Sequence, residues 1–346
     1  MDREQVTGRQ SFFLLFLFML GNLVTATGAK GMQAGWLLFL GLGVLSLPLF
    51  WLYVKAARQR PAGQVFVESL GKPVGILLTG IYCVLAVLMA GDAIRLFANF
   101  IVINDLNDAG AWGNSALLTL TVLFLLFCSM ESLGKAAWVI QPLTVALLVL
   151  SLALTAGKID LQRLLPVFAE EPALLAKGAL GSLAAILAPA FFPIFALSGS
   201  TPKKWIKSVL VSGGTICLLM AFLTMRDAAV LGFPAVSMFR FPSFAAANTL
   251  RHSEILISAV FVLSQPFRTA LCLRYAQACL KWWMPRWSRW YPPILLGLSV
   301  LSGALSWSSE QVRWRTAGEA VLTVLLVAGP LAVVIADKVK ARRSKA

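Results

Sequence analysis

The chain has 346 residues, of which 59% are hydrophobic and 13% charged, and its mean hydropathy is +0.81. This composition excludes an ordinary soluble domain and indicates an integral membrane protein that crosses the bilayer many times. The formal net charge of +15 comes from short basic clusters between apolar runs. That pattern is typical of loops at a lipid bilayer and argues against nucleic acid as a partner.

The residue types that most enzyme and metal sites require are scarce. His252 is the only histidine. The five cysteines all fall within apolar runs and lack the paired spacing of a zinc site or a disulfide framework. No cluster of nucleophile, base and metal ligands stands out, and no glycine-rich phosphate loop. We therefore predict a chain without enzymatic activity, cofactor or metal.

Ten apolar runs of bilayer length predict ten transmembrane helices and an all-α fold. In chain order they cover about residues 11–29, 35–56, 74–103, 115–130, 136–156, 180–200, 205–225, 254–280, 293–307 and 317–337. We expect a single membrane domain over 1–346. It divides into one repeat at about 10–157, a polar connector at 158–177, a second repeat at about 178–338 and a basic tail at 339–346.

The basic clusters predict the orientation of these helices. With ten spans, the clusters near residues 3–9, 55–72, 135, 203–207, 281–289 and 338–345 all fall on one side of the membrane. An excess of lysine and arginine marks the cytoplasmic side, so both termini are predicted to be cytoplasmic. Because each half has five spans, the second half must be inverted relative to the first.

The first and sixth spans both contain sequences that favour an interrupted helix. Residues 21–28 are rich in glycine and threonine, and residues 186–199 contain Pro189 and Pro193. Interrupted helices at the same rank in two inverted halves point to a binding site at the midplane of the membrane. The alternative is that the glycines only allow close packing and the prolines only kink the helix. The candidate site residues here are Gly21, Asn22, Thr25, Ala188, Pro189, Phe191 and Phe192.

Three charged residues fall inside predicted spans. Asp92 and Arg95 are three residues apart on one face of the third span, and Arg268 lies near the middle of the eighth. Such charges are costly in hydrocarbon and normally face a cavity or a partner. One interpretation is a local Asp92–Arg95 ion pair, with Arg268 capping freed carbonyls. The other is that an arginine binds a ligand carboxylate and Asp92 an amine or a proton.

The segment at 232–252 is too interrupted by proline and glycine to span the membrane. We expect it to be an outer, partly helical lid or re-entrant piece between the seventh and eighth spans. Simple loop packing is the equally ordinary alternative.

Several short stretches, in order along most of the chain, carry a resemblance to a known family. They are Gly8-Arg9-Gln10, Gly21, the run from Leu70 to Gly75, the run from Trp138 to Pro142, the run from Leu164 to Phe168, and Phe241-Pro242-Ser243. The sequence thereby resembles the GerAB-like spore germination proteins, which are spore permeases of the amino acid, polyamine and organocation transporter superfamily. The resemblance implies a LeuT-like fold of ten helices and a place in the inner membrane of a spore. It also implies A-type and C-type partner subunits and an amino acid or similar small nutrient as ligand.

Two functions follow as hypotheses. In the first, the chain is the B-type subunit of a nutrient germinant receptor: amides at residues 21–25 receive a carboxylate and carbonyls at 188–192 an amine. Phe191 and Phe192 then shape the side-chain pocket. In the second, the chain is a secondary amino acid permease, with proton coupling through Asp92 as an option. A membrane enzyme and a purely structural scaffold are weaker alternatives.

Overall fold

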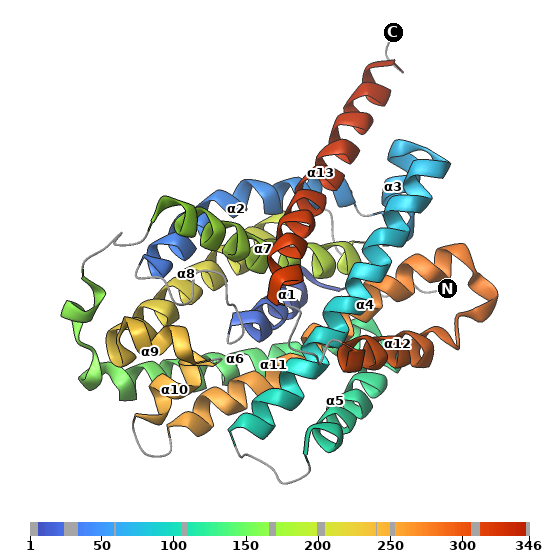
Figure 1. The fold of residues 1–346 in the computed structure, drawn as a ribbon. Helices are drawn as coiled ribbons and strands as arrows, with labels where there is room; N and C mark the ends of the chain where they lie inside the picture. Colours follow the sequence, from blue (N-terminus) through green and yellow to red (C-terminus); the bar gives the residue numbers. More distant parts are fainter. Residues whose placement is uncertain are drawn as a thin grey trace.

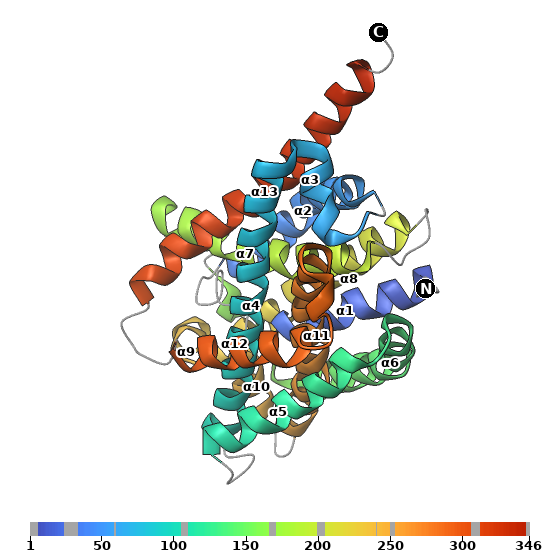
Figure 2. The ribbon, with the colours of Figure 1, turned by 90° about the vertical axis from the view of Figure 1, so that its right-hand side faces the viewer.

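The computed structural model describes residues 6–23, 34–58, 60–104, 110–165, 171–198, 205–239, 241–249, 253–305 and 312–343. Every regular element in these ranges is a helix (Figure 1 and Figure 2), and no strand occurs among the described residues. The prediction of an all-α protein is thus confirmed.

The helices are as follows. The first half contains α1 (Gly8–Leu23), α2 (Gly35–Ala57), α3 (Ala62–Leu70), α4 (Lys72–Ile103), α5 (Gly110–Phe127) and α6 (Met130–Thr155). The short 3-10 helices η1 (Ala156–Lys158) and η2 (Leu161–Leu164) follow. The second half contains α7 (Pro172–Leu197), α8 (Ile206–Leu231), α9 (Phe233–Met238), α10 (Pro242–Asn248), α11 (Glu254–Trp283), η3 (Pro285–Trp287), α12 (Tyr291–Leu305) and α13 (Val312–Arg343).

The apolar helices match the predicted runs in order. Eight of the described helices are long and apolar enough to cross a membrane. Two shorter apolar helices, α1 and α12, occupy the first and ninth predicted runs. The chain is therefore a multi-pass membrane protein in which every predicted run has its helix. The inverted relation of the two halves stays a prediction.

The structure changes the picture of the sixth span. Pro189 and Pro193 lie inside α7, which is one helix from Pro172 to Leu197, so the expected unwinding is not seen. Residues 186–195 are buried in the bundle. In a bilayer, unwinding this segment would leave several backbone groups unpaired, whereas each proline inside a continuous helix removes only one hydrogen-bond donor. What remains is a local effect: Pro193 has no N–H to donate to the Pro189 carbonyl.

The expected break in the first span falls largely outside the described residues. α1 ends at Leu23, and residues 24–33, which include Thr25, are not among those the structure describes. A break at 21–28 therefore stays a prediction.

The centre of the bundle is formed by α7 and α11, whose most apolar segments are 78% and 67% buried. α1 packs against both of them and against α6 and α8. α4 packs against α11 and crosses α12 closely at Gly91, where an added Cβ would lie 2.4 Å from the Ser299 carbonyl oxygen. Small residues at such crossings let membrane helices approach each other.

The two ends of the bundle carry different short helices (Figure 1 and Figure 2). α3 and the C-terminal end of α13 lie at one end, called here the α3 end. α9 and α10 lie toward the opposite end, the α10 end. These two short helices confirm that the segment at 232–252 is partly helical. In the predicted orientation the α3 end faces the cytoplasm.

Candidate ligand-binding site

The pairing of α4 with α11 places the intramembrane charges opposite each other. Three contacts follow a steady antiparallel register along the two helices. The Cys83 thiol donates to the Ala276 carbonyl at 3.9 Å. Asp92 faces Arg268 with 3.9 Å between carboxylate and guanidinium, and the rings of Phe100 and Phe261 are 4.3 Å apart. Two stretches far apart in the sequence thus share one charged layer.

Asp92 is the common partner of two arginines in this layer. Arg95 donates to Asp92 at 2.6 Å, which is the local pair that the sequence predicts. Arg268 lies on the other carboxylate oxygen. The Arg268 side chain is only 3% exposed, whereas that of Asp92 is 39% exposed. A buried cation therefore faces an anion that solvent or a small ligand can still reach.

The end of α1 joins the charged layer through a backbone carbonyl. Gln265 Nε2 donates to the Gly21 carbonyl at 2.6 Å, and an Arg268 guanidinium nitrogen lies 3.5 Å from the same oxygen. The last carbonyls of a helix lack intrahelical donors, and a nearby cation complements the negative end of the helix dipole. The Gln265 amide oxygen is buried and has no hydrogen-bond partner within the described ranges.

Gly21 lies against α11, so a side chain longer than a methyl group would have to enter space next to Arg268. A Cβ at this position would lie 3.4 Å from Arg268 Cβ and 3.5 Å from the Ser264 carbonyl oxygen. Asn22 belongs to the same helical turn, but its side chain is outside what the structure describes. Gln265 was missed in the sequence because a neutral amide in an apolar run carries little signal.

The residues predicted on α7 lie in a different layer. Phe191 stacks on Tyr82 at 4.7 Å between ring centroids, and Phe192 meets Tyr275 edge-on at 5.3 Å. Ala188 and Pro189 are buried in the same helix. We call this the inner aromatic layer; its members are Tyr53, Phe66, Tyr82, Phe191, Phe192, Phe195 and Tyr275. The structure therefore does not show Phe191 and Phe192 beside the charges.

A second aromatic cluster covers the other side of the charges. Phe241 and Phe244, at the start of α10, pack edge-on against Phe100 at 5.0 and 5.6 Å. We call this the outer aromatic layer; its members are Phe97, Phe100, Phe241, Phe244 and Phe261. Phe100 lies two helical turns, about 12 Å, beyond Asp92 toward the α10 end, and Tyr82 lies ten residues, about 15 Å, toward the α3 end. Along α4 the charged layer thus lies between two aromatic layers.

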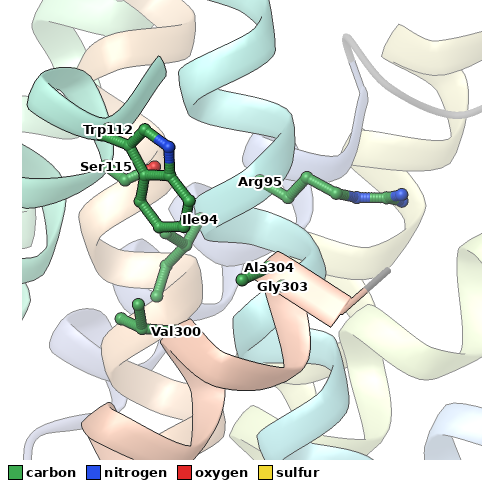
Figure 3. Close-up of a pocket in the computed structure, with 7 residues that line it drawn as sticks. All are labelled: Ile94, Arg95, Trp112, Ser115, Val300, Gly303 and Ala304. Atoms are coloured by element: carbon green, nitrogen blue, oxygen red, sulfur yellow. The ribbon is translucent and has the colours of Figure 1, made fainter. Parts of the chain in front are cut away.

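A shallow hollow lies beside this layer between α4, α5 and α12. It is lined by Ile94, Arg95, Trp112, Ser115, Val300, Gly303 and Ala304. The side chain of Arg95 extends away from the other lining side chains (Figure 3). The hollow is therefore a surface feature and separate from the contacts among Asp92, Arg268 and Gly21.

Comparisons with known proteins can now be set beside this geometry. A family model described as "Spore germination protein" matches residues 5–275. The chain belongs to the spore germination protein family. This family is the one that the sequence motifs resemble, so the resemblance is confirmed. A comparison with curated proteins gave no match.

Solved structures show what fold this spore germination protein has. It is similar to MhsT in complex with L-phenylalanine, with 16% identity and a TM-score of 0.62 over 96% of this chain and 89% of that chain. It is also similar to a mutant manganese transporter of Eremococcus coleocola, with 13% identity and a TM-score of 0.46 over 95% and 76% of the two chains. The likeness to MhsT confirms the LeuT-like fold. Family and fold are those of permeases and transporters.

Proposed function

We propose that this chain is the B-type membrane subunit of a spore nutrient germinant receptor. In this role it binds an amino acid or similar small nutrient and triggers germination. The family supports a role in germination, and the transporter fold supports the binding of a small solute. The proposed location is the inner membrane of the spore with both termini in the cytoplasm, and the proposed partners are A-type and C-type receptor subunits.

The observation that carries the proposal is the charged layer that lies between two aromatic layers. Ionisable side chains within membrane spans face a cavity or a partner because they are costly in hydrocarbon. Here Asp92, Arg95 and Arg268 meet beside the last carbonyls of α1. The arrangement offers a cation and an anion within one small region, which is what a zwitterion requires.

An amino acid has the two charged ends that match this layer. Arg268 receives the carboxylate in this proposal, because its guanidinium is a buried cation in the same layer as Asp92, 3.9 Å away. Asp92 can receive the amine. The α7 carbonyls are less suited to the amine than the sequence suggested, since α7 is continuous. MhsT was solved with L-phenylalanine, and we extend that ligand class to this chain as part of the proposal.

A thermal-shift screen of the purified protein against amino acids, sugars and nucleosides tests the proposal. A ligand at a hundredfold excess over its Kd stabilises the folded state by about 2.7 kcal/mol. We expect a selective rise in Tm with an amino acid. The rise should vanish in Gly21→Leu, whose side chain would enter the space of Arg268.

Gly41→Leu is the matched control, because no atom lies within 4 Å of a Cβ at that exposed position of α2. This variant should keep the full shift. In spores, Gly21→Leu should abolish the response to at least one nutrient and Gly41→Leu should not. A flat screen across all ligand classes, or an unchanged shift in Gly21→Leu, would overturn the proposed site.

A secondary amino acid permease with proton coupling is the second candidate. The observation that favours it is Asp92, a 39% exposed carboxylate inside a membrane helix beside two arginines. Concentrative uptake into liposomes under a proton gradient, lost in Asp92→Asn, would favour the permease. Co-purification with A-type and C-type subunits, and loss of germination on deletion, would favour the receptor.

A further inference from the structure

A second buried ionic network lies away from the candidate site, at the end of α8. Arg226 and Asp227 are each 2% exposed and form an ion pair at 2.5 Å. Ser243 of α10 donates its hydroxyl to the other Asp227 oxygen at 2.6 Å. Arg226 donates to the Ser243 carbonyl at 3.1 Å and to the Ser151 hydroxyl of α6 at 3.4 Å. One buried pair thus connects α8, α10 and α6.

The position of Asp227 shows why this network needs α10. Asp227 lies near the C-terminal end of α8, where the helix dipole disfavours a negative charge. A buried carboxylate there must be compensated on both oxygens. Arg226 donates to one Asp227 oxygen, and the Ser243 hydroxyl donates to the other. The carboxylate is therefore fully paired only while α10 is docked.

The same turns of α8 also anchor the connector between the two halves of the chain. The backbone N–H of Asp160 donates to the Ala229 carbonyl at 3.1 Å, and Arg163 donates to the Val230 carbonyl at 2.5 Å. Four segments, α6, η2, α8 and α10, consequently meet at the last turns of α8. This makes α8 the fixed part against which α10 is held.

The residues next to Ser243 connect this network to the outer aromatic layer. Phe241 and Phe244, on either side of Ser243, contribute two rings to the outer aromatic layer, which lies about two helical turns from Asp92 on the α10 side. Ser243 thus binds Asp227 while its neighbours pack on the α10 side of the charged layer. A displacement of α10 would break the Ser243 bonds and remove both rings together.

We propose that the Arg226–Asp227–Ser243 network is a latch that keeps the α10 end of the molecule closed over the charged layer. Opening toward that end requires Ser243 to leave Asp227, so the strength of this contact sets how often the buried Arg268 side of the charged layer becomes accessible. The inference goes beyond ligand binding, because the latch acts in the empty protein.

The test measures access to a cysteine placed beneath the outer aromatic layer. Ser264→Cys is the reporter, since Ser264 is fully buried on α11 between Phe261 and Arg268. It is made in a background in which the five native cysteines are replaced by alanine. A membrane-impermeant thiosulfonate is applied, without nutrient, to vesicles of each orientation.

Adding Ser243→Ala should raise the rate of reporter labelling roughly tenfold or more, because a hydrogen bond to a charged group is lost. The increase should occur only when the reagent faces the α10 end. Asp227→Asn should raise the rate in the same direction. If that variant fails to fold, Ser243→Ala decides the outcome, since it leaves the ion pair intact.

Ser258→Ala is the control, because among the described residues that buried serine bonds only the Glu254 carbonyl of its own helix. It should leave the labelling rate unchanged. An unchanged rate in Ser243→Ala, an equal rise in Ser258→Ala, or an equal rise from both faces would overturn the latch. Because no nutrient is present, none of these results bears on the proposed ligand.

Discussion

Asp92 is the residue on which the charged layer depends. It pairs with Arg95 at 2.6 Å and with Arg268 at 3.9 Å, so a single carboxylate lies between two cations. The two arginines are not equivalent, because the Arg95 side chain is 18% exposed and that of Arg268 only 3%. Loss of the carboxylate therefore removes the anion shared by two cations, whereas loss of Arg268 leaves the Asp92–Arg95 pair in place.

This asymmetry predicts unequal costs for two substitutions. Asp92→Ala should lower the free energy of unfolding by about 1–3 kcal/mol, because hydrogen bonds between charged groups are lost while the 39% exposed carboxylate is partly screened by solvent. Arg268→Met should cost less, because Asp92 keeps Arg95. Denaturant unfolding in detergent measures both values. The exposed Glu131–Lys135 pair is the control, and Glu131→Gln should change stability little. Equal costs for Asp92→Ala and Glu131→Gln would contradict the prediction.

How far the sequence predicts individual residues depends on how far apart their partners are. The three-residue spacing of Asp92 and Arg95 predicts their ion pair directly, because helical geometry fixes it. The contact of Gln265 with the Gly21 carbonyl cannot be predicted in that way. It joins two helices that are distant in sequence. Every residue has a backbone carbonyl, so no residue type indicates which carbonyl accepts the bond.

At the scale of elements, α7 is a helix whose continuity is determined by its burial and not by its local helix propensity. Two prolines within one turn predict an interrupted helix, and the structure has a continuous one. The prolines remove donors, but the rings of Phe191, Phe192 and Phe195 hold the same turns against α2, α4 and α11. Helix propensity considers only a residue and its neighbours in the helix, so it cannot predict the effect of tertiary packing of this kind.

The crossing of α4 and α12 gives a prediction about elements. In Gly91→Ala the new Cβ would lie 2.1 Å from the Ser302 hydroxyl oxygen and 2.4 Å from the Ser299 carbonyl oxygen. The Ser299 carbonyl belongs to the backbone of α12, which cannot move aside as the end of a flexible side chain can. The two helices must therefore separate. We expect a loss of about 1–3 kcal/mol or more in the free energy of unfolding.

The control for this crossing lies on α12 itself. Gly297 has no atom within 4 Å of an added Cβ. Gly297→Ala should therefore be neutral or stabilise the protein by up to about 1 kcal/mol, because glycine is unfavourable inside a helix. Equal behaviour of the two variants in thermal or denaturant unfolding would show that the crossing is looser than described.

At the scale of the whole molecule, a polar cluster fastens the α3 end. Asp337 of α13 accepts from Arg60 at 2.9 Å and from the Ser69 hydroxyl at 2.8 Å, and Arg58 lies 3.4 Å away. The Ser198 hydroxyl, directly after α7, donates to the Arg60 carbonyl at 2.6 Å. Four parts of the chain are thereby joined: α13, α3, the α2–α3 connection and the end of α7.

Asp337→Ala should loosen this end and lower the free energy of unfolding by about 2–3 kcal/mol, since hydrogen bonds to a charged group are lost. Glu68→Ala is the matched control from the same cluster. Its carboxylate is half exposed and 3.8 Å from Arg60, so its removal should change stability by less than about 1 kcal/mol. Similar losses in both variants would contradict a central role for Asp337.

The sequence predicts the whole molecule better than it predicts these contacts. Hydropathy alone places a helix at each of the ten runs, because a bilayer demands about 20 apolar residues per span. It does not say that Asp337 meets Arg60, or that α10 docks on α8. Such pairings depend on how the helices are arranged, and charge patterns within each span are too sparse to encode the arrangement.

The two aromatic layers differ in one chemical respect. The outer layer consists of phenylalanines, whereas the inner layer includes Tyr53, whose hydroxyl is buried without a hydrogen-bond partner in the described part of the chain. An unpaired buried hydroxyl costs about 1–3 kcal/mol. Water that reaches Tyr53 would recover that energy. Water entering from the α10 end would meet the same kind of group in the buried Glu254 carboxylate oxygen at the start of α11. Entry of water from either end would thus be favoured by a polar atom that lacks a hydrogen bond in the described part of the closed molecule.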